Sequence, residues 1–185
     1  KKKLHDQDSL IVKNILNFKK DLKPFLNDME VVMDCLIQKY ARKKNIQKIL
    51  NLDFKKKYSY VSKLNIHDLD QYFNTRLPRD HVKPESDYFA TQSLWNLITN
   101  KNILNVVEKI LGKEIMSNPV QNTRIKQPEK KLSKSSVHDG LSGRTPWHQD
   151  AAVLNSKGQK LTEMVTVWIP FTKTTKKNGG MITVK

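Results

Sequence analysis

The chain has 185 residues, which is the size of one domain with at most an appended helical region. Its single cysteine, Cys35, excludes an internal disulfide and a cysteine-based zinc cluster. No stretch approaches the roughly 20 continuous apolar residues of a membrane span, and the lysine-rich start lacks the apolar segment of a secretory signal. We therefore expect a soluble, cytoplasmic protein.

A formal charge of +16 raises the question of a nucleic-acid partner. Only five of the 34 basic residues are arginine, and lysine, asparagine and isoleucine are abundant, a skew that an AT-rich genome produces. Recognition of phosphates and base edges favours the arginine fork, and aromatic residues do not alternate with basic ones as in single-strand binders. Composition thus argues against nucleic acid and is compatible with an anionic small-molecule substrate. It does not indicate an oligomeric state.

The first half of the sequence predicts helices. Apolar residues recur at near-helical spacing between positions 10 and 18, and Pro24 interrupts or restarts that pattern. Residues 25–40 carry a regular stripe with a period of 3.6 residues, formed by Phe25, Met29, Val32, Met33, Leu36, Ile37 and Tyr40. Within this stretch we expect Cys35 to be a buried small hydrophobic residue.

A second amphipathic stretch covers residues 93–111. Asn100 and Asn102 are expected to divide it into two helices, and Gly112 is a plausible C-terminal stop. From residue 116 onward the pattern shifts toward strands. Residues 130–143 predict a long polar loop, in which His138 and Asp139 are expected to be solvated.

The last part of the chain predicts β-structure. Residues 164–171 are rich in β-branched and aromatic side chains, as in a buried strand. Asn178 and Gly179 form the dipeptide that most strongly signals a hairpin turn, and residues 181–184 are again β-branched. The order is therefore a first strand around residue 148, a loop, a buried strand, a tight turn and another strand.

The motif TPWHQD at residues 145–150 is the best candidate for chemistry. His148 and Asp150 are two positions apart, so in a strand their side chains leave the same face and can meet one metal ion. An imidazole beside a carboxylate suits non-haem Fe(II) when a second histidine completes a facial triad. Such a spacing also arises by chance, and an isolated histidine is more often a structural or surface residue. No histidine follows Asp150.

Several motifs resemble the phytanoyl-CoA dioxygenase family. They are PWHQD at 146–150, VTVWIP at 165–170 and NGG at 178–180. Upstream, LWNLI at 94–98 through VEKILG at 107–112, and QNTRIKQP at 121–128, agree with the same family. The resemblance covers roughly residues 90 to 185, and it assigns nothing to residues 1 to about 90.

The apolar pattern predicts a mainly helical region at 1–115, and the resemblance implies the first strands of a double-stranded β-helix (jelly-roll, cupin-like) core at 116–185, so together they predict an α+β protein. The resemblance also implies a dioxygenase that uses Fe(II), 2-oxoglutarate and O2 to hydroxylate a small-molecule or acyl substrate, releasing succinate and CO2. His148 and Asp150 would be the catalytic iron ligands. Asn122 and Trp168 would lie against 2-oxoglutarate. Lys126 shares the strand face of Asn122 by the two-residue period and is a further candidate for that site.

The sequence departs from the family pattern at its end. Family members supply a distal iron-binding histidine, and an arginine for the far carboxylate of 2-oxoglutarate, from strands beyond the Asn-Gly turn. Neither position exists in this sequence. We therefore expect it to be the N-terminal portion of a longer protein, and the 185-residue chain alone to bind iron weakly and turn over poorly.

Other interpretations stay open. The same fold could serve as a catalytically inactive binding or scaffold protein, and a basic helical nucleic-acid-binding module is a more distant alternative. For Trp147 and Trp168, tryptophans beside strands usually pack in the core. For Asn122, the alternative is a hydrogen-bonded amide at a strand end.

Overall fold

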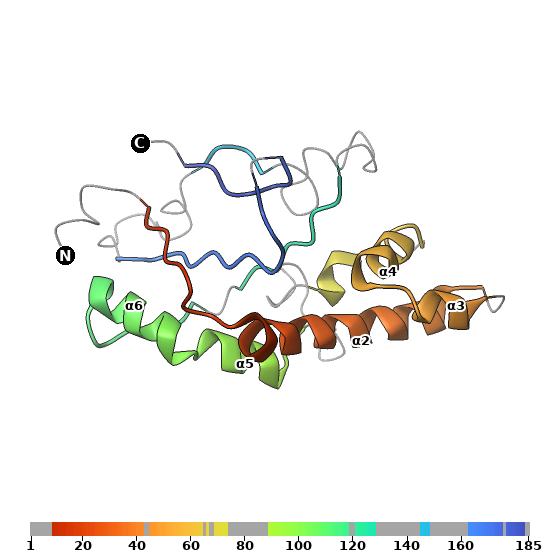
Figure 1. Ribbon diagram of the computed structural model, residues 1–185, viewed down its shortest axis with the longest axis horizontal. Coiled ribbons are helices and arrows are strands. Elements are labelled where there is room, and N and C mark those ends of the chain that lie inside the picture. Colours follow the sequence, from red (N-terminus) through yellow and green to blue (C-terminus); the bar gives the residue numbers. More distant parts are fainter. Residues whose placement is uncertain are drawn as a thin grey trace, which may run out of the picture.

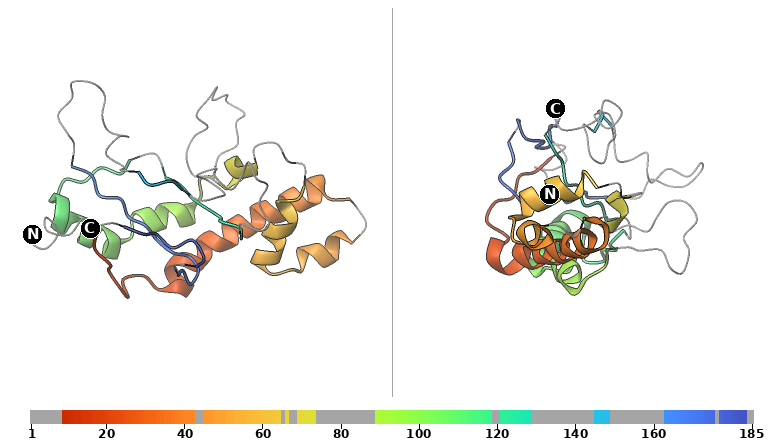
Figure 2. Two further views of the ribbon diagram at one scale, coloured as in Figure 1. Left: turned by 90° about the horizontal axis from the view of Figure 1, so that it is seen from above. Right: turned by 90° about the vertical axis from the view of Figure 1, so that its right-hand side faces the viewer.

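The helices form one layer, and non-helical segments from the C-terminal half lie over one side of it (Figure 1). The computed structural model describes residues 9–42, 45–64, 66, 69–73, 89–118, 121–128, 145–148, 163–175 and 177–183. In chain order the helices are the π-helix η1 (Phe18–Leu22), α2 (Lys23–Tyr40), α3 (Ile46–Leu50), α4 (Phe54–Val61), the 3-10 helix η2 (Leu69–Tyr72), α5 (Gln92–Ile98) and α6 (Lys101–Leu111). Seen from above, the non-helical segments cross the helical layer (Figure 2).

The longest helix, α2, carries most of the core. Pro24 lies in its first turn, where a missing backbone N–H breaks no helical hydrogen bond. Five side chains on one face are buried, namely Phe25, Met29, Met33, Leu36 and Ile37. The predicted apolar stripe is therefore confirmed from Phe25 to Ile37, with Val32 partly buried, whereas Tyr40 at its end is 39% exposed. Among the residues that the structure describes, no helix is both long enough and apolar enough to cross a membrane.

The predicted burial of Cys35 is wrong, because its side chain is exposed. Each residue of an α-helix advances by about 100° around the axis. With Met33 and Leu36 facing the core, Cys35 falls on the outer face, one turn after the exposed Val31. The apolar neighbours of Cys35 in the sequence suggest a buried side chain, whereas its position in the helical period places it on the exposed face.

The helical pattern expected between residues 10 and 18 is also wrong. The chain is non-helical until η1 begins at Phe18. Asn14 has a left-handed backbone with φ of 60°, which interrupts a right-handed helix. Leu10 and Ile11 are 54% and 83% exposed, so the first part of this segment lacks the apolar contact on which most helices in proteins depend, whereas Ile15 and Leu16 pack partly against the core.

The second amphipathic stretch is divided as expected. Thr91 caps α5 by accepting a hydrogen bond from Leu94 N–H, and Asn100 caps α6 through the N–H of Asn102. Gly112 ends α6 with a positive φ of 103°, a conformation that glycine adopts without strain. The break at Asn100 and the stop at Gly112 are both confirmed.

Phe25 joins the helical layer to the C-terminal segments. Its ring lies 5.3 Å from that of Phe89 and 5.1 Å from that of Phe171, measured between centroids. Phe171 also packs against the second core cluster, formed by Leu22, Leu97 and Ile103. One aromatic side chain from the C-terminal half therefore touches both parts of the core.

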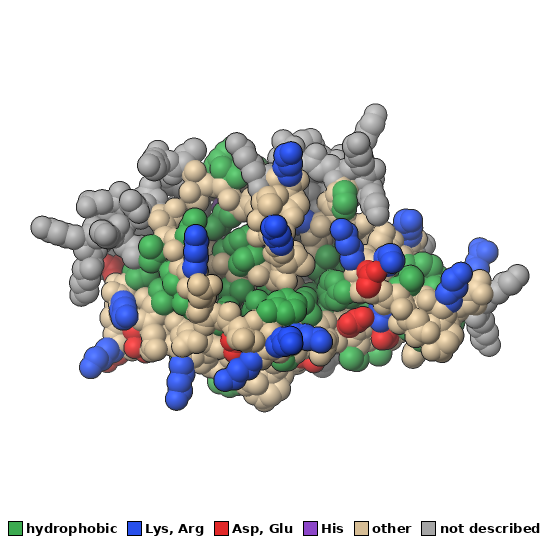
Figure 3. Space-filling view, viewed as in Figure 1, with side chains coloured by type: hydrophobic (Ala, Val, Ile, Leu, Met, Phe, Trp, Pro, Cys, Tyr) green, Lys and Arg blue, Asp and Glu red, His purple; other side chains and the backbone are tan. Residues whose placement is uncertain are grey.

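The strand ladder expected after residue 116 is not seen in the described residues. Residues 121–128 and 163–170 are neither helices nor assigned strands. A strand is defined by hydrogen bonds to a neighbouring strand, and the described part of the chain provides none for them. Apolar side chains remain visible between the helical layer and these segments (Figure 3), and Val167, Met181 and Ile182 are exposed. The family-implied β-core thus stays a proposal.

A buried lysine ties α4 to α2. Lys57 is 4% exposed, and its Nζ lies 3.0 Å from Glu30 Oε1 and 2.8 Å from Asp34 Oδ1. Burial alone would lower the pKa of Lys57, but hydrogen bonds to Asp34 and Glu30 and the attraction of both charges raise it above its ordinary 10.5. The stabilisation is therefore fully present below pH 10.5 and is lost as the pH rises through the folded-state pKa.

We expect Lys57→Met to lower the free energy of unfolding by roughly 2–3 kcal/mol at neutral pH, because it leaves two carboxylates without their cation. The cost stays moderate since the carboxylate side chains are 34% and 36% exposed. Urea unfolding followed by circular dichroism measures it. The difference from wild type should shrink above pH 10.5. Adding Glu30→Gln and Asp34→Asn should recover part of the loss, and equal stability of wild type and Lys57→Met at neutral pH would contradict the assignment.

Candidate functional site

Residues 121–128, which hold two of the predicted site residues, are anchored on the helical layer. Ile125 packs against the main core cluster. At the end of α4, the hydroxyl of Ser62 donates a hydrogen bond of 3.3 Å to Gln127 Oε1. These two contacts fix the position of the intervening Lys126.

Thr145, at the start of the TPWHQD motif, meets two cationic side chains from this segment. Arg124 Nη1 donates to Thr145 Oγ1 over 2.8 Å, and Lys126 Nζ donates to the same oxygen over 3.2 Å. The segment that precedes His148 is thus hydrogen-bonded to residues 121–128 through Thr145. Sequence reasoning missed Thr145 and Arg124, although the two-residue period that links Asn122 to Lys126 also includes Arg124.

The ring of His148 has a defined tautomer. Its Nδ1 lies 2.8 Å from the backbone oxygen of Pro146. A carbonyl oxygen only accepts hydrogen bonds, so Nδ1 carries a proton, and in the neutral ring Nε2 then carries the lone pair. Metal-binding histidines commonly donate their other ring N–H to a backbone carbonyl in this way. The ring is exposed, so Nε2 has the chemistry that a metal ligand requires.

The predicted turn at Asn178 and Gly179 is present. Asn178 N–H and Gly180 N–H both donate to the backbone oxygen of Thr175, and Asn178 Nδ2 donates to Lys173 O over 2.7 Å. Gly179 has a positive φ of 87°, and a Cβ there would lie 3.3 Å from Lys126 Cδ. The turn therefore closes against Lys126, so glycine suits this position for both its backbone and its lack of a side chain.

The structure gives less information about the other predicted site residues. Asn122 is exposed, Trp168 is 44% exposed and Trp147 is 70% exposed. Core packing of both tryptophans was therefore wrong. Trp168 precedes the half-buried Ile169, and neighbouring positions of an extended chain face opposite ways. Asp150 lies outside the described residues, and within them no three His, Cys, Asp or Glu side chains gather as a metal site would require.

Comparison with known protein families shows to which family the chain belongs. The sequence model of the family described as phytanoyl-CoA dioxygenase (PhyH) matches residues 9–185. The chain belongs to the phytanoyl-CoA dioxygenase family. Searches of curated proteins and of solved structures gave no match.

Membership in the phytanoyl-CoA dioxygenase family extends further along the chain than its recognisable motifs. These motifs begin near residue 90, whereas the family match begins at residue 9 and includes α2 and α4. The helical layer is therefore part of the family match. Members are typically oxygenases, and membership suggests activity dependent on Fe(II) and 2-oxoglutarate at the level of the family.

Proposed function

We propose that the protein is an Fe(II)/2-oxoglutarate-dependent dioxygenase in which His148 and Asp150 bind the iron. The observation that carries this proposal is the hydrogen bond from His148 Nδ1 to Pro146 O, within a chain that matches the family over residues 9–185. This hydrogen bond is of the kind by which metal-binding histidines are oriented, and it supports Nε2 as the ligand atom of His148. Asp150, two positions later, supplies a hard carboxylate ligand that complements it.

The residues around this pair would hold the co-substrate. Lys126, fixed by Thr145 and the turn at Gly179, brings a positive charge suited to a carboxylate of 2-oxoglutarate. Asn122 would donate a hydrogen bond from its amide, and Trp168 would supply an apolar wall. The jelly-roll core that the family implies would bring these side chains to one face.

With iron and 2-oxoglutarate bound, the site would supply O2 activation for hydroxylation of a C–H bond, with release of succinate and CO2. The protein's own part is to keep the ligand atoms of His148 and Asp150 on one face and to hold the carboxylate of 2-oxoglutarate near Lys126. The positive charge of the chain favours an anionic small-molecule substrate. Family members complete the ligand pair with a distal histidine, and no histidine follows Asp150 in this sequence.

The test is formation of succinate from 2-oxoglutarate by the intact protein with Fe(II) and O2, across a panel of small anionic substrates. We expect succinate release that requires Fe(II) and stops when a chelator is added. Iron-replete protein that binds a substrate from the panel but releases no succinate would instead identify a binding protein of the same fold.

Thr145 should act as a positioning residue. Thr145→Val removes the oxygen that accepts from Arg124 and Lys126 and should weaken Fe(II) binding by roughly 10-fold, the lower end of losses seen for groups behind metal ligands. Both cations can turn to water, so the free energy of unfolding should change by less than about 1 kcal/mol. Thr145→Ser keeps the hydroxyl and should bind Fe(II) like wild type. If Thr145→Ser were as impaired as Thr145→Val, the hydroxyl would not be responsible.

A further inference from the structure

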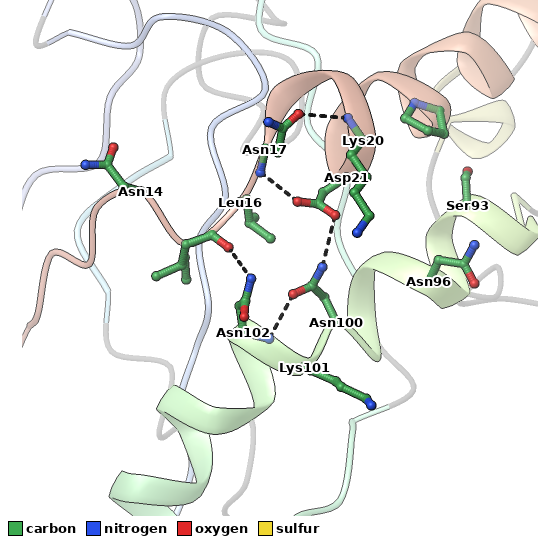
Figure 4. A pocket seen from close by; sticks show the side chains of 12 residues that line it. Asn14, Leu16, Asn17, Lys20, Asp21, Ser93, Asn96, Asn100, Lys101 and Asn102 are labelled. Carbon is green, nitrogen blue, oxygen red and sulfur yellow. Dashed lines mark hydrogen bonds between the residues drawn. The ribbon is translucent and has the colours of Figure 1, made fainter.

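A hollow of about 750 Å³ lies where residues 14–17 pass the junction between α5 and α6 (Figure 4). Its volume falls within the range of about 300–1,000 Å³ that small-molecule sites occupy. Five of its twelve lining residues are asparagine and two are lysine. None of the residues proposed to bind iron or 2-oxoglutarate lines it, so it is a separate feature of the molecule.

The acidic group of this hollow is already engaged. Asp21 Oδ2 accepts a hydrogen bond of 2.6 Å from the backbone N–H of Asn17. Its other oxygen, Oδ1, accepts from Asn100 Nδ2 over 3.3 Å (Figure 4). The carboxylate therefore holds the N-terminal segment against the start of α6, and both of its oxygens are used within the protein.

Two further asparagine contacts complete this framework. Asn102 Nδ2 donates to the backbone oxygen of Ile15 over 2.8 Å, and Asn100 Oδ1 accepts from Asn102 N–H over 3.0 Å. These bonds join the two walls of the hollow. The second bond engages the amide oxygen of Asn100 within the α5–α6 junction.

Three other side chains at the hollow can donate hydrogen bonds, those of Lys20, Lys101 and Asn96. Lys20 extends toward the α5–α6 junction, and Lys101 projects from the same junction (Figure 4). In the part of the chain that the structure describes, neither lysine forms an ion pair, the pairs found there being those of Lys56 and Lys57. Asn96 Oδ1 accepts from Gln92 Nε2 over 2.9 Å, which leaves Asn96 Nδ2 as a donor.

We propose that this hollow binds a small molecule bearing an oxyanion, a phosphate or a carboxylate, through Lys20, Lys101 and Asn96. Two ammonium groups and an amide N–H₂ group match the acceptor-only oxygens of such a group. Among the described residues Asp21 forms no ion pair with either lysine, and its two oxygens accept hydrogen bonds from Asn17 and Asn100. The site does not depend on the iron chemistry proposed above, so either proposal can fail without the other.

The first test uses inorganic phosphate and malonate as separate probes, in calorimetric titrations of chelator-treated protein at fixed ionic strength. We expect saturable binding of at least one probe, and the probe that binds identifies the kind of oxyanion. Asn96→Asp keeps the acceptor for Gln92 but replaces the N–H₂ donor with a negative charge, so it should weaken binding at least 10-fold. Asn105→Asp, an exposed position of α6 with the same charge change, should stay within twofold of wild type.

The second test concerns the lysines. Lys20→Gln with Lys101→Gln should weaken binding of the same probe at least 10-fold. Lys48→Gln with Lys63→Gln removes the same charge from exposed positions away from the hollow and should have less than a twofold effect. Absence of saturable binding of both probes, or equal weakening by the two lysine pairs, would overturn the proposal and identify Lys20 and Lys101 as ordinary solvated surface charges.

Discussion

His148→Ala or Asp150→Ala is expected to abolish Fe(II)-dependent succinate release by the intact protein. Loss of a residue that hydrogen-bonds to a metal ligand commonly lowers metal affinity or activity by about 10–100-fold. Loss of the ligand itself should therefore lower succinate release by more than about 100-fold. His148 is exposed, and its Nδ1 contacts a backbone oxygen two residues away, so its removal should leave the helical core intact. Fe(II) titration and succinate assays, with circular dichroism as a check on folding, measure these effects.

The chain offers a matched control for these variants. His138 lies ten positions before His148 and Asp139 lies eleven before Asp150, and the sequence predicts a solvated role for both. His138→Ala and Asp139→Ala should keep activity within about twofold of wild type. Wild-type succinate release by both His148→Ala and Asp150→Ala would refute the ligand assignment, and loss of activity in His138→Ala would place an iron ligand there instead.

Phe25→Ala should cause the largest loss of stability, about 3–5 kcal/mol, because it removes a buried ring from between two aromatic partners. The Phe25 ring is 2% exposed and contacts Phe89 from the helical region and Phe171 from the C-terminal half. Its loss should therefore loosen the attachment of residues 163–171 as well as the core. Urea unfolding gives the change in free energy, and amide hydrogen exchange of residues 163–171 reports the loosening.

Two variants calibrate this result. Phe25→Leu keeps most of the apolar volume and should lose less than Phe25→Ala, about 1–2 kcal/mol. Val31→Ala lies on the exposed face of the same helix and should change stability by less than about 0.5 kcal/mol. A loss below 1 kcal/mol in Phe25→Ala would mean that the ring does not bridge the two parts of the core.

Helices with a buried stripe could be predicted from the sequence, and those without one could not. The stripe of α2 and the stops at Asn100 and Gly112 follow from local periodicity and capping chemistry. Residues 10–17 show similar spacing, but Asn14 takes a left-handed backbone, Leu10 and Ile11 are exposed, and Ile15 and Leu16 pack against the core without forming a helix. Periodicity predicts which face a helix would bury, and tertiary contacts decide whether the helix forms.

The pair His148 and Asp150 stays a prediction from the sequence, and the contacts that support the site could not be predicted from it. The spacing of His148 and Asp150 is readable because a strand repeats every two residues. The convergence of Arg124 and Lys126 on Thr145 joins residues about 20 positions apart, and a single sequence carries no record of such contacts. The closure of Gly179 against Lys126 is likewise a long-range contact, although the glycine itself is visible in the turn motif.

The most direct measurement of the central claim is an anaerobic titration of the intact protein with Fe(II) and 2-oxoglutarate, followed by visible absorption. When 2-oxoglutarate chelates protein-bound Fe(II), a charge-transfer band forms that neither component gives alone. We predict that this band saturates at one iron per chain and is absent in His148→Ala. If the wild-type protein gives no band, or if the band is undiminished in His148→Ala, iron is not held by this histidine and the proposed oxygenase site is wrong.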